Sequence, residues 1–156
     1  MYKTPMNLAK EVGDMYKKIL VPLDGSPLAE KALDQAERLA KTFNSEIILF
    51  QVVHFMPIYG SPELVAPLIV DERHKEFAEK YLGELVKAIE GRGLKAKAIV
   101  KTGQQVAVEI IDFAKENGVD LIAMCTRGRS GISRWVLGST AIKVVTRAET
   151  PILLLR

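Results

Sequence analysis

The sequence LIAMCTRGRSGISRWVLGST, residues 121–140, decides the fold prediction. It opens with a run of five apolar or small residues, which is typical of a short buried strand. A loop with two glycines and three arginines follows, and the stretch ends at Gly138, Ser139 and Thr140, where the apolar spacing of a last helix begins. Because the N–H groups of a first helical turn and the helix dipole both favour anions, this order of strand, loop and helix predicts a phosphate site.

Apolar runs elsewhere predict the remaining strands. The expected strands are residues 19–23, 47–53, 96–101, 121–125 and 151–155. Apolar residues at helical spacing lie between consecutive strands, Ser26 and Pro27 are a typical N-cap and first helical residue, and Gly118 is a typical helix end. Strands that alternate with helices in this way predict an α/β fold built on a five-stranded, doubly wound parallel sheet.

The composition limits the class of protein. With 156 residues, of which 48% are hydrophobic, the chain fits one domain, expected at residues 16–156 behind an N-terminal extension of residues 1–15. The net charge of +3 comes from charges of both signs that nearly cancel, which argues against a nucleic-acid partner. A single cysteine excludes an internal disulfide and fits a reducing compartment. No apolar run resembles a signal peptide or a membrane span, so we expect a soluble cytoplasmic protein.

Asp24 follows the first expected strand and therefore lies at the same edge of the sheet as the glycine loop. If the first and fourth strands are neighbours, both features border one crevice, where doubly wound sheets bind their ligands. Taken alone, Asp24 has a plainer interpretation as a turn residue that helps to cap the next helix. His54 and His74 are expected on the surface or in a loop. His54 follows the second strand and could therefore come near the crevice, but a single imidazole does not make a catalytic group.

The glycine loop also allows two interpretations. Gly128, Gly131 and Gly138 are either plain turn residues or points of close approach to a phosphate, and the hydroxyl-bearing helix start favours the phosphate. The loop arginines either neutralise that phosphate or form a solvated rim, and both interpretations stay open. Cys125, at the end of the strand, is expected as a core residue rather than a reactive thiol.

Residues 125–140, CTRGRSGISRWVLGST, resemble the C-terminal signature of the universal stress protein family. The ATP-binding branch of that family carries a glycine, two residues, a second glycine, nine residues, a third glycine and then serine or threonine. Gly128, Gly138 and Ser139 match the later positions of this motif, whereas Cys125 stands where the branch has its first glycine. The resemblance covers residues 16–156, including the runs ILVPLDGS and PILLL near its two ends.

This resemblance implies an adenine nucleotide alpha-hydrolase-like or flavodoxin-like topology and the binding of ATP, with Mg²⁺ on its phosphates. It implies that residues 22–24 line the adenine and ribose side, that Ile47 contacts the base, and that Gly128, Arg129 and the backbone of residues 138–140 hold the phosphates. The complete set of expected nucleotide-binding residues is Pro22, Leu23, Asp24, Ile47, Cys125, Arg127, Gly128, Arg129, Gly131, Gly138, Ser139 and Thr140.

The last expected strand, residues 151–155, would leave an uncharged edge on the sheet if nothing covered it. Pairing with the same strand of a second copy removes that edge and obeys two-fold symmetry, and the resemblance also implies a homodimer. We therefore expect a cytoplasmic stress-response module that binds ATP as a homodimer, with no catalytic residue and no metal site formed by the protein. Two alternatives stay open: a family member that binds no nucleotide and acts through protein contacts, and a slow ATPase.

Overall fold

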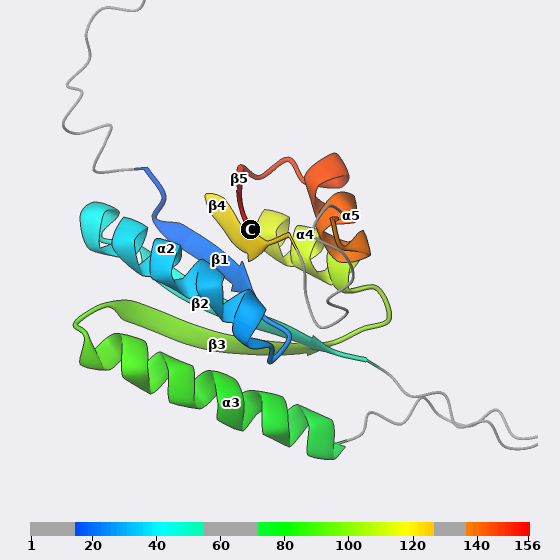
Figure 1. Ribbon diagram of the computed structural model, residues 1–156, viewed down its shortest axis with the longest axis horizontal. Helices are drawn as coiled ribbons and strands as arrows, with labels where there is room; N and C mark the ends of the chain where they lie inside the picture. Colours follow the sequence, from blue (N-terminus) through cyan, green and yellow to red (C-terminus); the bar gives the residue numbers. More distant parts are fainter. Residues whose placement is uncertain (1–14, 55–71, 127–136) are drawn as a thin grey trace, which may run out of the picture.

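The computed structural model describes residues 15–54, 72–126 and 137–156, which form a parallel sheet with helices on both faces (Figure 1). The strands are β1 (Lys18–Pro22), β2 (Glu46–Val53), β3 (Lys95–Thr102), β4 (Leu121–Cys125) and β5 (Ile152–Leu155). The helices are α2 (Pro27–Phe43), α3 (Glu72–Gly91), α4 (Val106–Glu116) and α5 (Ser139–Arg147). The predicted α/β fold with five parallel strands is therefore confirmed.

The helices begin and end where the sequence marks them. Ser26 is the N-cap of α2, and its side chain accepts a hydrogen bond from the N–H of Ala29, with Pro27 in the first helical turn. Asn44, with φ 55°, ends the same helix in the left-handed conformation. Gly118, with φ 61°, follows α4 and takes a conformation that a residue with a side chain rarely adopts.

The strand order is β3-β2-β1-β4-β5, so β1 and β4 are neighbours, as the crevice prediction required. This order differs from the flavodoxin order 2-1-3-4-5, in which the first and fourth strands are apart. Helices α2 and α3 pack on one face of the sheet, and α4 and α5 pack on the other. Because the connections change face between β1 and β4, the switch point of the doubly wound sheet lies there.

The core is divided into two layers by the sheet. Alternate residues of β1 point to opposite faces: Ile19 and Val21 pack against α2 and α3, whereas Leu20 packs on the side of α4 and α5. These three side chains are completely buried, which explains why β1 reads as a continuous apolar run.

The amino ends of the central strands are tied together by hydrogen bonds. The N–H of Lys18 donates to Oδ2 of Asp120 at 2.8 Å, and the N–H of Asp120 donates to the carbonyl of Lys18 at 3.0 Å. On the other side of β1, the N–H of Glu46 donates to the carbonyl of Lys17 at 2.8 Å. These bonds fix the register of β1 against both of its neighbours.

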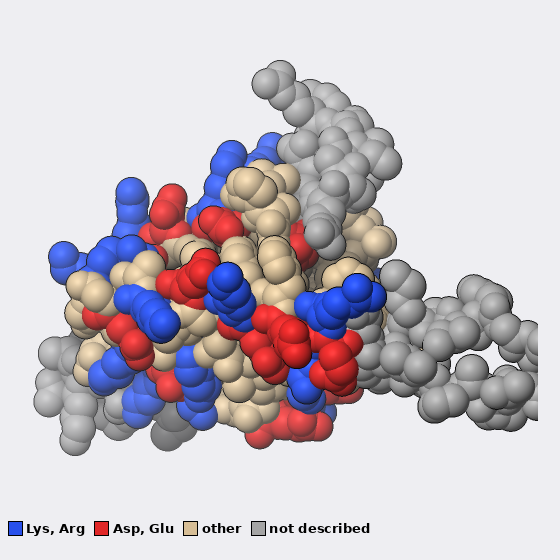
Figure 2. All heavy atoms as spheres, turned by 90° about the horizontal axis from the view of Figure 1, so that it is seen from below, with Lys and Arg blue, Asp and Glu red and all other residues tan. Residues whose placement is uncertain are grey.

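The two edges of the sheet differ in charge. Three lysines lie along β3, and Nζ of Lys97 pairs with Glu46 at 2.9 Å. Strand β5 has the sequence ILLL, and all of its residues are half-buried. On the face seen in Figure 2, basic and acidic side chains are interspersed. No helix within the described ranges is long and apolar enough to cross a membrane.

Candidate functional site

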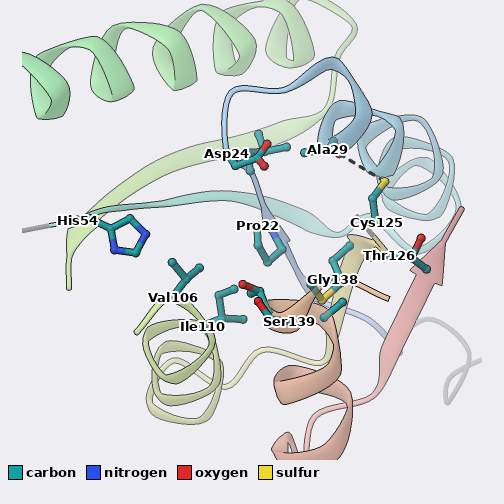
Figure 3. A pocket seen from close by; sticks show the side chains of 14 residues that line it. Pro22, Asp24, Ala29, His54, Val106, Ile110, Cys125, Thr126, Gly138 and Ser139 are labelled. Atoms are coloured by element: carbon teal, nitrogen blue, oxygen red, sulfur yellow. Dashed lines mark hydrogen bonds between the residues drawn. The ribbon is translucent and has the colours of Figure 1, made fainter. Parts of the chain in front are cut away.

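A pocket with a cavity volume of about 320 Å³ lies at the carboxyl ends of the central strands (Figure 3). It sits at the switch point between β1 and β4, the place where this architecture binds ligands. Its described lining residues are Pro22, Leu23, Asp24, Ala29, His54, Val106, Ile110, Met124, Cys125, Thr126, Gly138, Ser139, Thr140 and Ala141. The predicted crevice therefore exists, and it joins the end of β1 to the start of α5.

The end of β1 supplies the first wall of the pocket. The N–H of Leu23 donates to the carbonyl of Phe50 at 2.8 Å, which holds this segment against β2. Asp24 Oδ1 accepts hydrogen bonds from the N–H of Ser26 at 3.0 Å and from its hydroxyl at 2.6 Å. Asp24 thus supports the cap of α2, as the plainer interpretation holds, and it also lines the pocket, while its role in binding a ligand stays a prediction.

The start of α5 supplies the opposite wall. The N–H of Gly138 donates to the carbonyl of Thr126 at 2.7 Å, and the N–H of Ile142 donates to the carbonyl of Gly138 at 3.0 Å. Between them, the N–H groups of the first helical turn, at residues 139–141, have no acceptor within the part of the chain that the structure describes. No side chain of the described residues caps this helix. The wall therefore presents donors at the positive end of a helix dipole, which is suited to an anion.

The details at Gly138 modify the prediction. Its own N–H is occupied by Thr126, so the donors that face the pocket come from the three residues that follow it. Its φ of −61° and ψ of 149° are open to any amino acid. A glycine is therefore not needed here for its backbone conformation, and any requirement for it must come from the space in the pocket.

Cys125 lies in the pocket wall but its thiol is turned away from the α5 start. Only 7% of the residue is exposed, and its Sγ lies 3.8 Å from the carbonyl oxygen of Ala29 on α2 (Figure 3). Burial raises the pKa of the Cys125 thiol, which lowers its thiolate fraction at neutral pH. These features fit the predicted core residue rather than a reactive thiol.

The third wall combines His54 with apolar residues of α4. His54 follows the last residue of β2, and Val106 and Ile110 come from the first turns of α4 (Figure 3). The sequence placed His54 only near the crevice and did not identify the other lining residues of this wall. Such lining residues lie in first helical turns and at strand ends. These positions identify pocket residues only once the strand order is known.

Ile47 requires a correction. It is the second residue of β2, pairs with Ile19 and Ala96, and is completely buried in the core. At about 3.3 Å per residue it lies roughly 20 Å from the other end of the strand, where the pocket is. The prediction that Ile47 contacts a base is wrong, because Ile47 lies at the amino end of β2, whereas the ligands of this architecture bind at the carboxyl ends of the strands.

Part of the expected site falls outside the described residues. Arg127, Gly128, Arg129 and Gly131 belong to the segment 127–136, and their roles remain predictions. The expected N-terminal extension lies almost entirely in the undescribed residues 1–14.

The family model of the universal stress protein family matches residues 15–156. The chain belongs to the universal stress protein family. It is 34% identical over 143 residues to the universal stress protein MJ0531 of Methanocaldococcus jannaschii, covering 92% of this chain and 84% of the relative. It is 35% identical over 149 residues to the universal stress protein YxiE of Bacillus subtilis, covering 91% of this chain and 100% of the relative.

Solved universal stress proteins have the same fold as this one. The structure of UspA from Lactobacillus plantarum superimposes with a TM-score of 0.78 at 24% identity, over 91% of this chain and 99% of that one. Two others contain nucleotides: one in complex with cAMP (TM-score 0.61, 19% identity, 92% and 98% covered) and one from Archaeoglobus fulgidus in complex with dAMP (TM-score 0.67, 24% identity, 91% and 99% covered). At these identities the likeness establishes the fold, and the nucleotides belong to those relatives.

Proposed function

We propose that this universal stress protein binds ATP in the pocket between β1 and β4, with the phosphates against the start of α5. The observation that carries the proposal is the first turn of α5, where the N–H groups of residues 139–141 lack acceptors among the described residues. Ser139 and Thr140 also bring hydroxyl groups to the same wall of the pocket. Hydrogen bonds to an ionised phosphate are stronger than those between neutral groups, so this wall favours a polyphosphate over a neutral ligand.

The sugar is assigned to Asp24. Its carboxylate lines the pocket across from α5, and two hydrogen bonds from Ser26 fix the orientation of Oδ1. A carboxylate held in this way can accept hydrogen bonds from ribose hydroxyls. The solved relatives with cAMP and dAMP support the choice of an adenine nucleotide, since the same fold holds such ligands in them.

Cys125 is compatible with this assignment, although the ATP-binding branch of the family has glycine at that position. The residue belongs to the regular strand β4 and has no positive φ, so its side chain causes no backbone strain. Its thiol points to the carbonyl of Ala29 and leaves the α5 wall open.

Mg²⁺ would be held mainly by the phosphates. Within the described residues there is no group of three or more His, Cys, Asp or Glu side chains that could hold a metal ion. Mg²⁺ commonly keeps several waters and is bound through substrate phosphates, so a dedicated protein cage is not needed. When bound, the ion would neutralise phosphate charge.

We propose that the ATP-bound protein acts in the cytoplasm as a stress-response module. We assign no reaction to it. The single cysteine is a free, buried thiol, which fits a reducing compartment. The proposal therefore predicts ATP binding without ATP hydrolysis. Slow ATP hydrolysis is the alternative, and an assay of released phosphate distinguishes the two.

Binding can be tested by calorimetric titration with Mg-ATP, together with an assay of released phosphate. We expect one saturable site per chain and no multiple turnovers. Asp24→Ala should weaken binding roughly tenfold or more, the value of a hydrogen bond to a charged group. The matched control is Asp34→Ala, which removes the same charge from an exposed position of α2 and should leave the affinity unchanged. Absence of saturable binding to the unmodified protein would contradict the proposal.

We also propose a homodimer formed by β5. The carbonyl of Pro151 accepts a hydrogen bond from the N–H of Ile122, and the carbonyl of Leu155 accepts one from the N–H of Thr126. Because the backbone groups of successive residues in a strand point in opposite directions, those of Leu154 point to the open edge of the sheet. Ile142 and Val145 of α5, each 44% exposed, add apolar surface on the helix that precedes this strand. Protein contacts through this surface are also the basis of the alternative function without a nucleotide.

The dimer can be tested by sedimentation. Leu154→Pro removes an outward N–H group while the hydrogen bonds to β4 remain, and proline is tolerated at such edge positions. We expect a dimer for the unmodified protein and a monomer for the variant, with circular dichroism confirming that the variant is folded. A monomeric unmodified protein would contradict this part of the proposal.

A further inference from the structure

His54 is the only basic side chain among the described residues that line the pocket. It is exposed, and Figure 3 shows its ring beside Val106, on the far side of the pocket from Cys125 and Thr126. Its position therefore separates it from the wall that carries the anion-binding donors.

The backbone that carries His54 is held firmly. The preceding residue, Val53, pairs with Thr102 of β3, and its carbonyl accepts a hydrogen bond from the N–H of Gly103 at 3.1 Å. The end of β2 is thus pinned to β3, and the imidazole starts from a fixed point at the pocket rim.

The strand order sets the distance between the two walls. β2 and β4 lie on opposite sides of β1, and neighbouring strands are about 4.8 Å apart, so their ends are separated by roughly 10 Å. That separation matches the length of a nucleoside rather than that of a single phosphate. A ligand anchored at the start of α5 would therefore extend its uncharged end toward His54.

The surface beside His54 suits a flat ring. Val106 and Ile110 offer apolar contacts for a ring face, and the ring nitrogens of the His54 imidazole can form hydrogen bonds with a ring edge. Purine edges carry both donors and acceptors. A phosphate, by contrast, finds three unpaired N–H groups together with the hydroxyl groups of Ser139 and Thr140 at the α5 wall. The first turn of α4 also has N–H groups without acceptors among the described residues, at Val106 and Ala107, but it brings no hydroxyl group.

We propose that His54 contacts the edge of the nucleotide base and helps to select ligands that carry a heteroaromatic ring. The inference rests on the proposed nucleotide binding and adds a residue that determines specificity. His54 acts on the ring and not on the phosphates. Removal of the His54 imidazole should therefore weaken the binding of ligands that carry a base and leave the binding of ligands without a base unchanged.

The test is a calorimetric titration of the full chain with two probes, Mg-ATP and inorganic tripolyphosphate. His54→Leu should weaken ATP binding by roughly two- to tenfold, the value of one neutral hydrogen bond, and leave tripolyphosphate binding unchanged. His54→Asn keeps a donor and an acceptor and should recover part of the affinity. His74→Leu is the matched control, since His74 lies on the exposed surface of α3 and does not line the pocket.

The outcomes separate this inference from the proposed function. If the unmodified protein binds neither probe, the nucleotide site itself is refuted, and the role of His54 with it. If the unmodified protein binds ATP and His54→Leu binds it equally well, only the role of His54 is refuted. An equal loss of ATP and tripolyphosphate binding would show that His54 acts on the phosphates, which also overturns the inference.

Discussion

The two ends of the sheet use their polar groups differently. At the amino ends, the carboxylate of Asp120 accepts the N–H of Lys18, and the carbonyl of Asn117 accepts Nζ of the same lysine at 2.8 Å. At the carboxyl ends, the first turn of α5 retains N–H groups without acceptors in the described part of the chain, and Asp24 borders a cavity. Both ends have hydrogen bonds that join neighbouring strands, such as the bond from the Leu23 N–H to the Phe50 carbonyl at the carboxyl ends, but the carboxyl ends also leave donors for a ligand.

This difference follows from the architecture. Every helix that crosses between parallel strands begins above their carboxyl ends, so the positive ends of the helix dipoles collect there. The amino ends receive the last turns of the helices, where carbonyl groups lack partners and anions are disfavoured. A second cavity does lie at that end, near the last turns of α4 and α5, but it borders acidic and basic side chains such as Asp120 and Arg147. Of the two cavities, the one at the carboxyl ends is the one that borders helix starts within the described ranges.

The largest expected effect is a loss of stability at the amino ends. Asp120→Ala removes the acceptor of the Lys18 N–H and should lower the free energy of unfolding by about 1.5–3 kcal/mol, the range for a hydrogen bond to a charged group. Urea denaturation measures this change. The affinity of the folded variant for Mg-ATP should stay unchanged because the pocket lies at the other end of β1.

A control for this variant is Asp112→Ala, which removes an exposed carboxylate of α4 and should change stability by less than about 0.5 kcal/mol. If Asp120→Ala weakened ATP binding while leaving the urea midpoint in place, the division between the two ends of the sheet would be incorrect.

The second prediction concerns space in the pocket. Gly138→Val introduces a branched side chain at a residue whose φ of −61° accepts any amino acid, so the backbone should not be strained. We expect the affinity for Mg-ATP to fall roughly tenfold or more, equivalent to about 1.4 kcal/mol, with a stability loss of at most about 1 kcal/mol for a poorer N-cap. Titration and thermal unfolding measured on the same preparation separate these effects. Unchanged affinity would mean that the ligand does not approach Gly138.

Much of the fold could be read from the sequence, whereas the site could be read only in part. The strands are predictable because a parallel sheet covered on both faces needs continuous apolar runs, and β1 and β2 have them. The error at Ile47 came from the family resemblance, since the rule that ligands bind at the carboxyl ends of the strands excludes the start of β2. Val106 and Asp24 come to line the same pocket only through the strand order, which local patterns do not encode.

The third prediction tests whether the carboxyl ends contribute to stability as well. The hydroxyl of Ser26 caps α2 and also donates to Asp24, so Ser26→Ala removes both interactions. We expect a stability loss of about 1 kcal/mol, typical of an N-cap, and a drop in Mg-ATP affinity of only about threefold because the carboxylate itself remains. Ser26→Asp, which restores a capping acceptor but repels Asp24, should recover stability without recovering affinity. If Ser26→Asp recovered stability and Mg-ATP affinity equally, Asp24 would have no role in binding apart from its support of the α2 cap.

The smallest effect is expected at Cys125, whose thiol lies at the border between core and pocket. Burial raises its pKa, so the folded protein favours the neutral thiol. As the pH rises past the ordinary thiol pKa of about 8.5, Cys125 ionises in the unfolded chain before it ionises in the folded protein. The stability that the buried neutral thiol contributes is therefore present below that pH and lost above it. Alkylation by iodoacetamide near neutral pH should therefore be several-fold slower than that of glutathione and should accelerate as the pH increases.

Occupation of the pocket should slow the alkylation of Cys125 further, because the residue lines the same cavity as the α5 start. Mass spectrometry of intact protein follows the reaction, and Cys125→Ser supplies the unreactive reference for the only cysteine in the chain. Protection by Mg-ATP but not by inorganic phosphate at the same concentration would place the nucleotide beside β4, at the end of the sheet that leaves donors for a ligand. A rate equal to that of glutathione, with or without nucleotide, would show that the thiol is open to solvent and that this wall does not enclose the ligand.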